Sequence, residues 1–185
     1  MLGIYLSLYC SSLYLFMPNE NQAVACLIYN HDKTKILLIK RRDVPVWVLP
    51  GGGIDLGEKP ELAAIRETLE ETCLTCQIKR LVGVYYPKNR LSRKTFLFEL
   101  TTLDAVDDKP TEETLGARFF SLNKLPPMPP PYRNWIYDGV KIPEGTINYS
   151  HVPGVHYGNF LKLLILHPIK VLRFLLSRLG LHWNS

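Results

Sequence analysis

Three glutamates in the middle of the chain have the spacing that a divalent cation would require. Glu67, Glu70 and Glu71 fall within about one turn of a predicted helix and project from one face. Like charges at this spacing destabilise a helix by about 0.2–0.5 kcal/mol per pair, so a bound cation would offset the repulsion. Because the face offers carboxylate oxygens and neither histidine nor thiolate, Mg²⁺ is favoured, or Mn²⁺. A solvated acidic helix face is the alternative interpretation.

A run of glycines precedes that helix. Pro50 is followed by Gly51, Gly52 and Gly53, where the backbone is free of side-chain sterics. A glycine turn that leads into a helix offers backbone N–H groups to phosphate oxygens. Carboxylates beside a loop that accommodates phosphate imply a metal ion that bridges the two. The expected chemistry is therefore performed on a phosphorylated compound.

The segment 52–74, GGIDLGEKPELAAIRETLEETCL, resembles the Nudix box. Its fixed positions are matched by Gly52, Glu58, Arg66, Glu67, Glu70 and Glu71. The departures are Thr68, at an aliphatic position of the motif, and Cys73, where the motif has glycine. Because glycine at a helix end normally supplies a left-handed turn, a modified C-cap is expected at Cys73.

This resemblance, which covers roughly residues 20–140, implies both a fold and an activity. The fold would be α/β, a Nudix-type α/β/α sandwich with a mixed sheet. The activity would be Mg²⁺-dependent hydrolysis of a diphosphate bond, in a small nucleotide-type substrate consisting of a nucleoside diphosphate linked to another moiety. The alternative is a catalytically silent Nudix-fold module that binds a ligand or is tethered to a membrane. Lost box glutamates would have favoured that alternative, and none is lost.

The resemblance also implies roles for individual residues. The expected metal ligands are the carbonyl of Gly52 and the carboxylates of Glu67, Glu70 and Glu71. Glu58 and Arg66 would brace the loop against the helix. The expected catalytic residues are Glu67, Glu70 and Glu113. The general base would be Glu67 or Glu113, although Glu113 is equally well interpreted as a solvated loop acid beside Glu112.

Arg41, Trp47 and Tyr86 are the candidate substrate-binding residues. Trp47 and Tyr86 could stack on a base, although aromatic side chains on strands more often belong to a core. Arg41, at the end of a predicted strand, could meet a phosphate or only water. The sequence does not identify the diphosphate compound.

Alternating and apolar runs predict the elements that position this site. The predicted strands are 22–29, 35–40, 46–49, 77–86, 94–101 and 117–122, and the first two are expected to form a hairpin. A basic turn, PKNRLSRK, separates strands 77–86 and 94–101. The helix that begins near Lys59 is predicted to bury a stripe consisting of Leu62, Ile65, Leu69, Cys73 and Cys76. A second short helix is predicted over 132–140.

Composition indicates one domain with appendages, in a chain of 185 residues that is 46% hydrophobic. The domain is predicted over 18–141, after an apolar segment 1–16 interpreted as a leader or a mis-assigned start. The formal net charge is +5, but residues 145–185 hold four basic residues and no acid, so the nearly neutral remainder argues against a DNA partner. Four irregularly spaced cysteines do not suggest a disulfide framework, so a cytoplasmic location is expected.

The C-terminal extension, 142–185, is predicted to carry a basic amphipathic helix over 160–181 with a bend at Pro168. The leucines lie on one side of this helix and the basic residues lie within one arc on the other side. The basic residues are Lys162, Lys170, Arg173 and Arg178. Such a helix could pack on the domain, form a homodimer contact, or lie peripherally on an anionic membrane surface.

Overall fold

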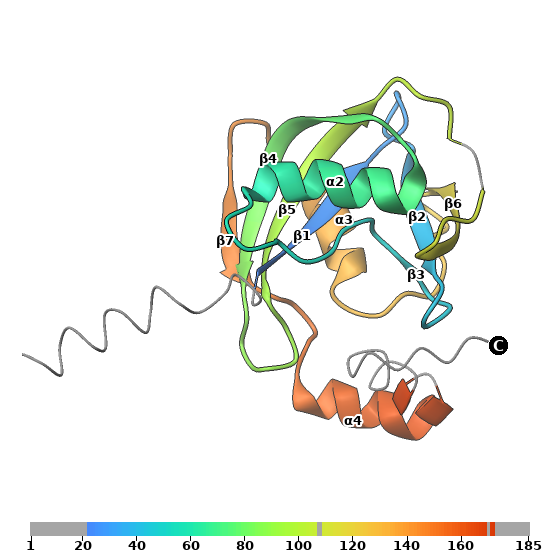
Figure 1. Cartoon of the computed structure of the whole chain (residues 1–185). Coiled ribbons are helices and arrows are strands. Elements are labelled where there is room, and N and C mark those ends of the chain that lie inside the picture. The colour runs from blue at the N-terminus through green and yellow to red at the C-terminus, as the bar shows by residue number, and fades with distance from the viewer. Residues whose placement is uncertain (1–21, 107–108, 170, 173–185) are drawn as a thin grey trace, which may run out of the picture.

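The computed structural model describes residues 22–106, 109–169 and 171–172. Its strands and helices are shown in Figure 1. In chain order they are β1 (Gln22–Ile28), β2 (Lys35–Arg41), β3 (Trp47–Val48), α2 (Pro60–Thr72), β4 (Cys76–Tyr86), β5 (Lys94–Thr102), β6 (Thr114–Ser121), α3 (Tyr132–Lys141), β7 (Asn148–His151) and α4 (Tyr157–Leu166). The predicted leader, 1–16, lies outside the described residues.

The strands form two sheets, and the larger one is mixed as expected. Four strands follow the order β1-β5-β4-β7, in which β1–β5 and β4–β7 are parallel and β4–β5 is antiparallel. Three strands follow the order β3-β2-β6 and are antiparallel. β7 was not predicted from the sequence. It lies within the segment 142–185, beyond the predicted end of the domain, and it pairs with β4.

The predicted hairpin between the first two strands is wrong. β1 and β2 are joined by a turn, in which the side-chain carbonyl of Asn30 accepts the backbone N–H of Lys35 at 2.7 Å. Beyond one isolated bridge, between Tyr29 and Ile36, the strands separate into different sheets (Figure 1). The side chains of both strands are apolar on both faces of the strand. Such strands are covered on both faces, whereas a two-stranded hairpin would leave one face exposed to solvent.

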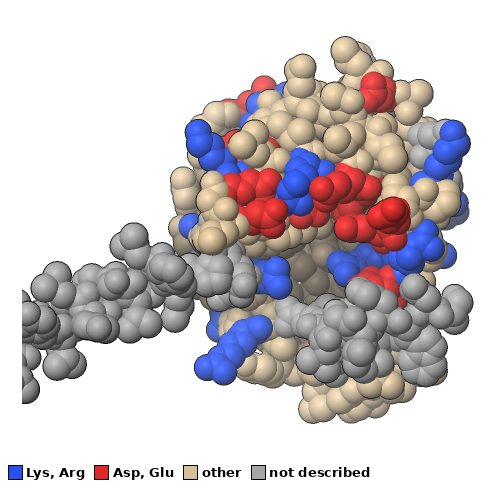
Figure 2. Space-filling model, viewed as in Figure 1, with Lys and Arg blue, Asp and Glu red and all other residues tan. Residues whose placement is uncertain are grey.

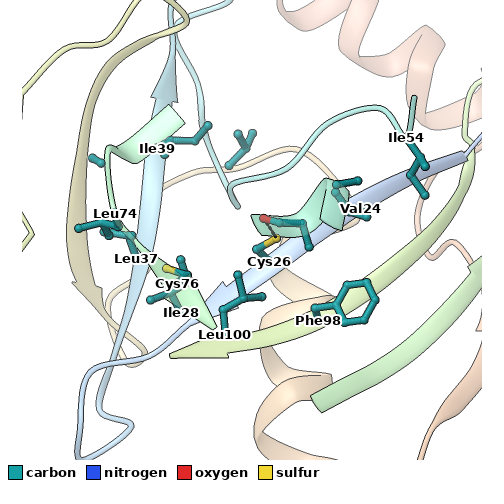
Figure 3. Packing of buried hydrophobic residues seen from close by; sticks show 14 residues of the cluster. Val24, Cys26, Ile28, Leu37, Ile39, Ile54, Leu74, Cys76, Phe98 and Leu100 are labelled. Atoms are coloured by element: carbon teal, nitrogen blue, oxygen red, sulfur yellow. Dashed lines mark hydrogen bonds between the residues drawn. The ribbon is translucent and has the colours of Figure 1, made fainter. Parts of the chain in front are cut away.

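Helices cover both faces of the strands, which confirms the expected α/β/α layering. On one face, Cys26 of β1 packs towards α2, and its thiol donates to the carbonyl of Ala64 at 3.6 Å (Figure 3). On the other face, Leu27 of β1 packs in a cluster with Trp135 and Ile136 of α3. α2, which carries the candidate ligands, is therefore fixed by direct packing on β1.

The face of α2 that is buried differs from the predicted stripe. Leu62 and Leu69, expected in the core, are 57% and 49% exposed, and Cys73 is also exposed. The buried residues of α2 are Ala63, Ala64, Glu67, Thr68, Glu71 and Thr72. Small alanines allow the helix to approach the strands closely, and this orientation turns two carboxylates inward. The apolar periodicity identified the wrong face because the helix packs through its small residues.

The predicted C-terminal helix is only partly within the described residues. α4 spans Tyr157–Leu166 and is interrupted at His167, next to the predicted bend at Pro168. Lys170, Arg173 and Arg178, which would form most of the basic arc, lie outside the described residues. Among the helices that the structure describes, none has the length and apolar character needed to cross a membrane.

Candidate active site

Three carboxylates converge beside the glycine loop. Glu67, Glu71 and Glu113 each offer an oxygen, and these oxygens lie within 4.8 Å of one another. Glu67 and Glu71 are buried and one turn apart on α2, whereas Glu113 is exposed and lies in the loop before β6. The cluster therefore joins residues that are more than forty positions apart in the sequence. A divalent ion with oxygen ligands fits such a set of donors.

Glu70, the other expected ligand, lies outside this cluster of the described residues. Its side chain is 46% exposed and accepts a hydrogen bond from Nη1 of Arg66 at 3.3 Å. Sequence reasoning assigned Glu70, Glu67 and Glu71 to one helix face, but the structure turns Glu67 and Glu71 towards the core side and Glu70 towards solvent. The third carboxylate of the cluster belongs to Glu113, which was expected as a catalytic candidate.

The glycine loop is packed too tightly against β1 and α2 for larger residues. Gly51 has a φ of 139°, and a Cβ there would lie 2.3 Å from the carbonyl oxygen of Val24. A Cβ on Gly52 would lie 2.2 Å from the carboxylate of Glu67. The carbonyl of Gly52, an expected metal ligand, accepts the N–H of Val24 at 3.0 Å, which leaves it one further lone pair. Only glycines bring this backbone so close to the carboxylates.

Arg66, a predicted bracing residue, lies on α2 and contacts the loop that precedes it. Its guanidinium donates to both carboxylate oxygens of Glu58, at 3.0 and 2.8 Å, and to the carbonyl of Gly53 at 3.1 Å. It also donates to Glu67 at 2.9 Å. Glu58 in turn accepts the N–H of Asp55 at 3.0 Å. Because bidentate arginine–carboxylate pairs are geometrically specific, these contacts fix the loop relative to the cluster.

Burial and mutual repulsion determine the charge state of the cluster. Burial, with smaller contributions from the nearby Glu67 and Glu113, raises the pKa of Glu71 to about 8 against the opposing effects of Gly51 and Arg41. The N–H of Gly51 donates to Glu71 at 2.7 Å. Burial also raises the pKa of Glu67. A group of buried carboxylates that repel one another is the electrostatic environment that a divalent cation would stabilise.

The loop that presents Glu113 is held by Arg42. The guanidinium of Arg42 donates to the carbonyls of Glu112 and Thr111, at 3.1 and 2.7 Å, and its backbone N–H donates to the carbonyl of Glu113 at 3.1 Å. The hydroxyl of Thr114 donates to the backbone carbonyl of Glu71 at 3.0 Å. Sequence reasoning did not assign this supporting role to Arg42 or Thr114, since neither belongs to the box and only the fold brings them to it.

The three predicted substrate-binding residues have different surroundings in the structure. Arg41 is paired with Asp43 through two hydrogen bonds, at 2.9 and 2.5 Å, and lies near enough to Glu71 to lower its pKa. Trp47 is half-buried, with its ring centroid 4.7 Å from that of Phe120. Tyr86 is 42% exposed at the end of β4.

Figure 2 shows the charge pattern on this face. A band of acidic side chains with a basic one among them runs across the face where α2 lies, and below it is a hollow with basic side chains on both sides. Carboxylates for a cation and basic groups for an anion therefore border the same depression. The arrangement suits an anionic compound that contacts the basic side chains directly and the carboxylates through a metal ion.

Comparison with protein families gives a match of the chain to the NUDIX domain over residues 20–139. The chain is 41% identical over 103 residues to a putative 8-oxo-dGTP diphosphatase of Bacillus subtilis, a match that covers 55% of this chain and 68% of that one. It is 40% identical over 97 residues to an ADP-ribose pyrophosphatase of Methanocaldococcus jannaschii, covering 50% and 57%. It is 30% identical over 96 residues to mouse diphosphoinositol polyphosphate phosphohydrolase 3-alpha, covering 51% and 58%. The chain thus spans little more than half the length of the second and third relatives.

Solved structures share the fold. A NUDIX hydrolase from Nitrosomonas europaea is 26% identical and superposes with a TM-score of 0.62, covering 72% of this chain and 79% of that one. A UDP-X diphosphatase is 22% identical with a TM-score of 0.62, covering 81% and 76%. At 22% identity the second likeness concerns the fold alone.

Proposed function

Because the chain belongs to the NUDIX domain family, we propose that this Nudix hydrolase cleaves the diphosphate bond of a nucleoside diphosphate linked to another moiety. Two relatives at 40% identity or more are a putative diphosphatase and a pyrophosphatase, both named for nucleotide-type compounds. The observation that carries the proposal is the convergence of Glu67, Glu71 and Glu113 within 4.8 Å, beside a glycine loop that admits no Cβ at Gly52. A merely solvated acidic helix would not bury two of its carboxylates.

We infer that the cofactor is Mg²⁺, with Mn²⁺ as a substitute. Glu67, Glu71 and Glu113 would hold it, and Glu70 and the carbonyl of Gly52 stay predicted as further ligands. When bound, the ion neutralises charge on the diphosphate and lowers the pKa of bound water. The chain's own part is to align these carboxylates, which the Arg66 contact does for Glu67 and the Gly51 contact does for Glu71. Each contact lowers the pKa of its carboxyl, and burial opposes this effect.

Glu113 is the better placed of the two candidate general bases. Glu67 is buried and one of its oxygens already accepts the guanidinium of Arg66 at 2.9 Å. Glu113 is exposed, so water reaches it, and Arg42 fixes its loop. A carboxylate at the edge of the cluster can accept the proton of an attacking water without giving up a buried ion pair.

Release of phosphate or nucleotide from a panel of diphosphate compounds tests the proposal. With the full chain we expect turnover that requires Mg²⁺ or Mn²⁺. Glu71→Gln should lower kcat/KM by about 100-fold or more, since even residues that only orient metal ligands contribute about 10- to 100-fold. Glu61→Gln, at an exposed position of the same helix, is the matched control and should retain activity. Binding of the panel compounds without turnover would instead favour the catalytically silent module.

Contacts of the C-terminal segment and the cytoplasmic location stay predictions. The described part of this segment exposes apolar side chains, among them Leu161, Ile165 and Ile169, at 57%, 71% and 73%. These side chains suit either an anionic membrane surface or a homodimer through 160–181. Binding to anionic against neutral lipid vesicles, together with the mass in solution, distinguishes the two.

A further inference from the structure

The loop between β4 and β5, residues 87–93, is called here the basic loop because Lys88, Arg90 and Arg93 lie in it. All three side chains are exposed. In the described part of the chain, none of the three forms a salt bridge with an acidic residue. The arginines Arg41 and Arg66, by contrast, have carboxylate partners. The basic loop therefore offers positive charge that no acidic side chain of the described residues neutralises through a salt bridge.

Arg93 brings this charge to the active site. Its Nη1 lies 3.7 Å from the point that a Cβ on Gly53 would occupy, so the guanidinium rests against the glycine loop. Gly53 is tied to Arg66, and the adjacent Gly52 faces the carboxylate of Glu67. Arg93 is thus next to the loop that packs on the proposed metal centre. In Figure 2 basic side chains also border the hollow below the acidic band.

The basic loop has hydrogen bonds that hold its backbone in place. The side chain of Asn89 donates to the carbonyl of Val155 at 3.0 Å and accepts the N–H of Leu91 at 2.9 Å. The hydroxyl of Thr95 donates to the carbonyl of Arg93 at 3.1 Å. Because the backbone of the loop is already held in place, a ligand that binds Arg93 does not have to order it. The contact with Arg93 therefore contributes more to the affinity for that ligand.

We propose that Arg93 is a specificity-determining residue that binds a phosphate group of the substrate other than the two in the scissile diphosphate. Lys88 and Arg90 add to the attraction. The substrate class would then be a diphosphate whose attached group carries at least one further phosphate. A guanidinium matches two phosphate oxygens at once, whereas a neutral sugar would leave Arg93 without an anionic partner. This inference rests on the proposed function and narrows its substrate class.

Matched substrates test the assignment. With the full chain and Mg²⁺, ATP and diadenosine tetraphosphate represent phosphorylated groups, and ADP-ribose and UDP-glucose represent neutral ones. We expect the wild type to have a kcat/KM about tenfold or more higher for the phosphorylated pair. Arg93→Gln should lower that value by about tenfold or more, mainly through KM, because a charge-assisted hydrogen bond contributes that much. For the neutral pair the loss should be small.

Two further variants complete the kinetic test. Arg93→Lys should restore part of the preference. Lys35→Gln, an exposed charge at the far end of β2 from the glycine loop, should leave the preference unchanged. Equal losses for both substrate pairs in Arg93→Gln, or no loss, or a wild-type preference for the neutral pair, would each overturn the assignment.

A binding measurement separates this inference from the proposed function. If no compound is hydrolysed, the proposed function fails, and calorimetry with Mg²⁺ and inorganic tripolyphosphate against pyrophosphate still decides the role of Arg93. Tighter binding of tripolyphosphate by the wild type, lost in Arg93→Gln, supports the subsite. The same difference in both proteins, or none in either, contradicts it.

Discussion

The carboxyl of Glu71 is enclosed by α2, the glycine loop and two other glutamates. Burial raises its pKa to about 8, with Glu67 and Glu113 adding to the shift. In the metal-free protein, ionising Glu71 is therefore unfavourable at neutral pH, and a proton or a cation relieves the cost. In the unfolded chain the same carboxyl ionises at its ordinary value of 4.5. Folding stability of the metal-free protein must consequently depend on this group.

The first prediction concerns that pH dependence. A folded-state pKa above the unfolded value gives stability that is fully present below about pH 4.5 and is lost as pH rises towards about 8. Glu71→Gln should remove this loss, so at pH 8 without divalent ions the variant should exceed the wild type in free energy of unfolding by on the order of 3 kcal/mol. Urea titrations at pH 5 and pH 8 in EDTA measure the difference. Identical pH profiles for both proteins would contradict it.

The second prediction separates the candidate bases. Glu113→Gln should lower kcat by about 100-fold or more, since general-base catalysis typically contributes about 10²- to 10⁴-fold. The adjacent and exposed Glu112→Gln is the control and should be nearly unchanged, because Glu112 is not in the carboxylate cluster. The rates of both variants at pH 7 and saturating Mg²⁺ provide the readout. A Glu113→Gln variant that keeps its rate would return the role to Glu67.

At the scale of elements, α2 shows what periodicity can and cannot predict. Its start was predictable, because Pro60 suits the first turn and the helix does begin there. Its end was predictable too, because Cys73 stands where the motif has glycine, which normally supplies a left-handed turn. Cys73 adopts that left-handed conformation, with a φ of 58°. The buried face was not, because Ala63 and Ala64 make the contact with β1 while the leucines remain in solvent. Residue hydrophobicity alone does not reveal close packing through small side chains.

The third prediction follows from that orientation. Ala64→Leu would force a larger side chain between α2 and β1, where Ala64 is fully buried, and should cost about 1–3 kcal/mol in unfolding free energy. Leu69→Ala, at a position that is 49% exposed, should change stability by only about 0.5 kcal/mol. Urea unfolding of both variants measures these values. The reverse order of effects would show that the leucine stripe faces the core after all.

Other parts of the arrangement depend on contacts that lie far apart in the sequence. The turn after β1 was predictable from Asn30 and Asp32, but the divergence of the two strands depends on β5 and β6, their actual partners. The polar sequence of β7, NYSH, gives no strand signal, and parallel pairing with β4 defines it. Arg93 likewise belonged only to a basic turn until the fold placed it against Gly53.

At the scale of the whole molecule, the segment after α3 completes both the sheet and the site. β7 covers the edge of β4, and Val152, which is 3% exposed, joins the core on the α3 side. The N–H of Val152 donates to the carbonyl of Tyr86 at 2.9 Å, at the start of the basic loop. Val155 then accepts the side chain of Asn89. Residues beyond 141, where the sequence predicted the domain to end, therefore hold the loop that carries Arg93.

The last prediction tests this dependence by comparing chains with the same start that end at residue 141 or at residue 156. The shorter chain loses β7, the burial of Val152 and the Val155 acceptor. It should lose about 3 kcal/mol or more in unfolding free energy, because burying a valine contributes about 1.5–3 kcal/mol and each hydrogen bond about 1 kcal/mol. The longer chain keeps these contacts and should match the full chain in urea unfolding and in its preference for phosphorylated substrates. If both truncated chains unfold alike, the segment 142–156 is not part of the folding unit, and the fixed position of the basic loop must have another cause.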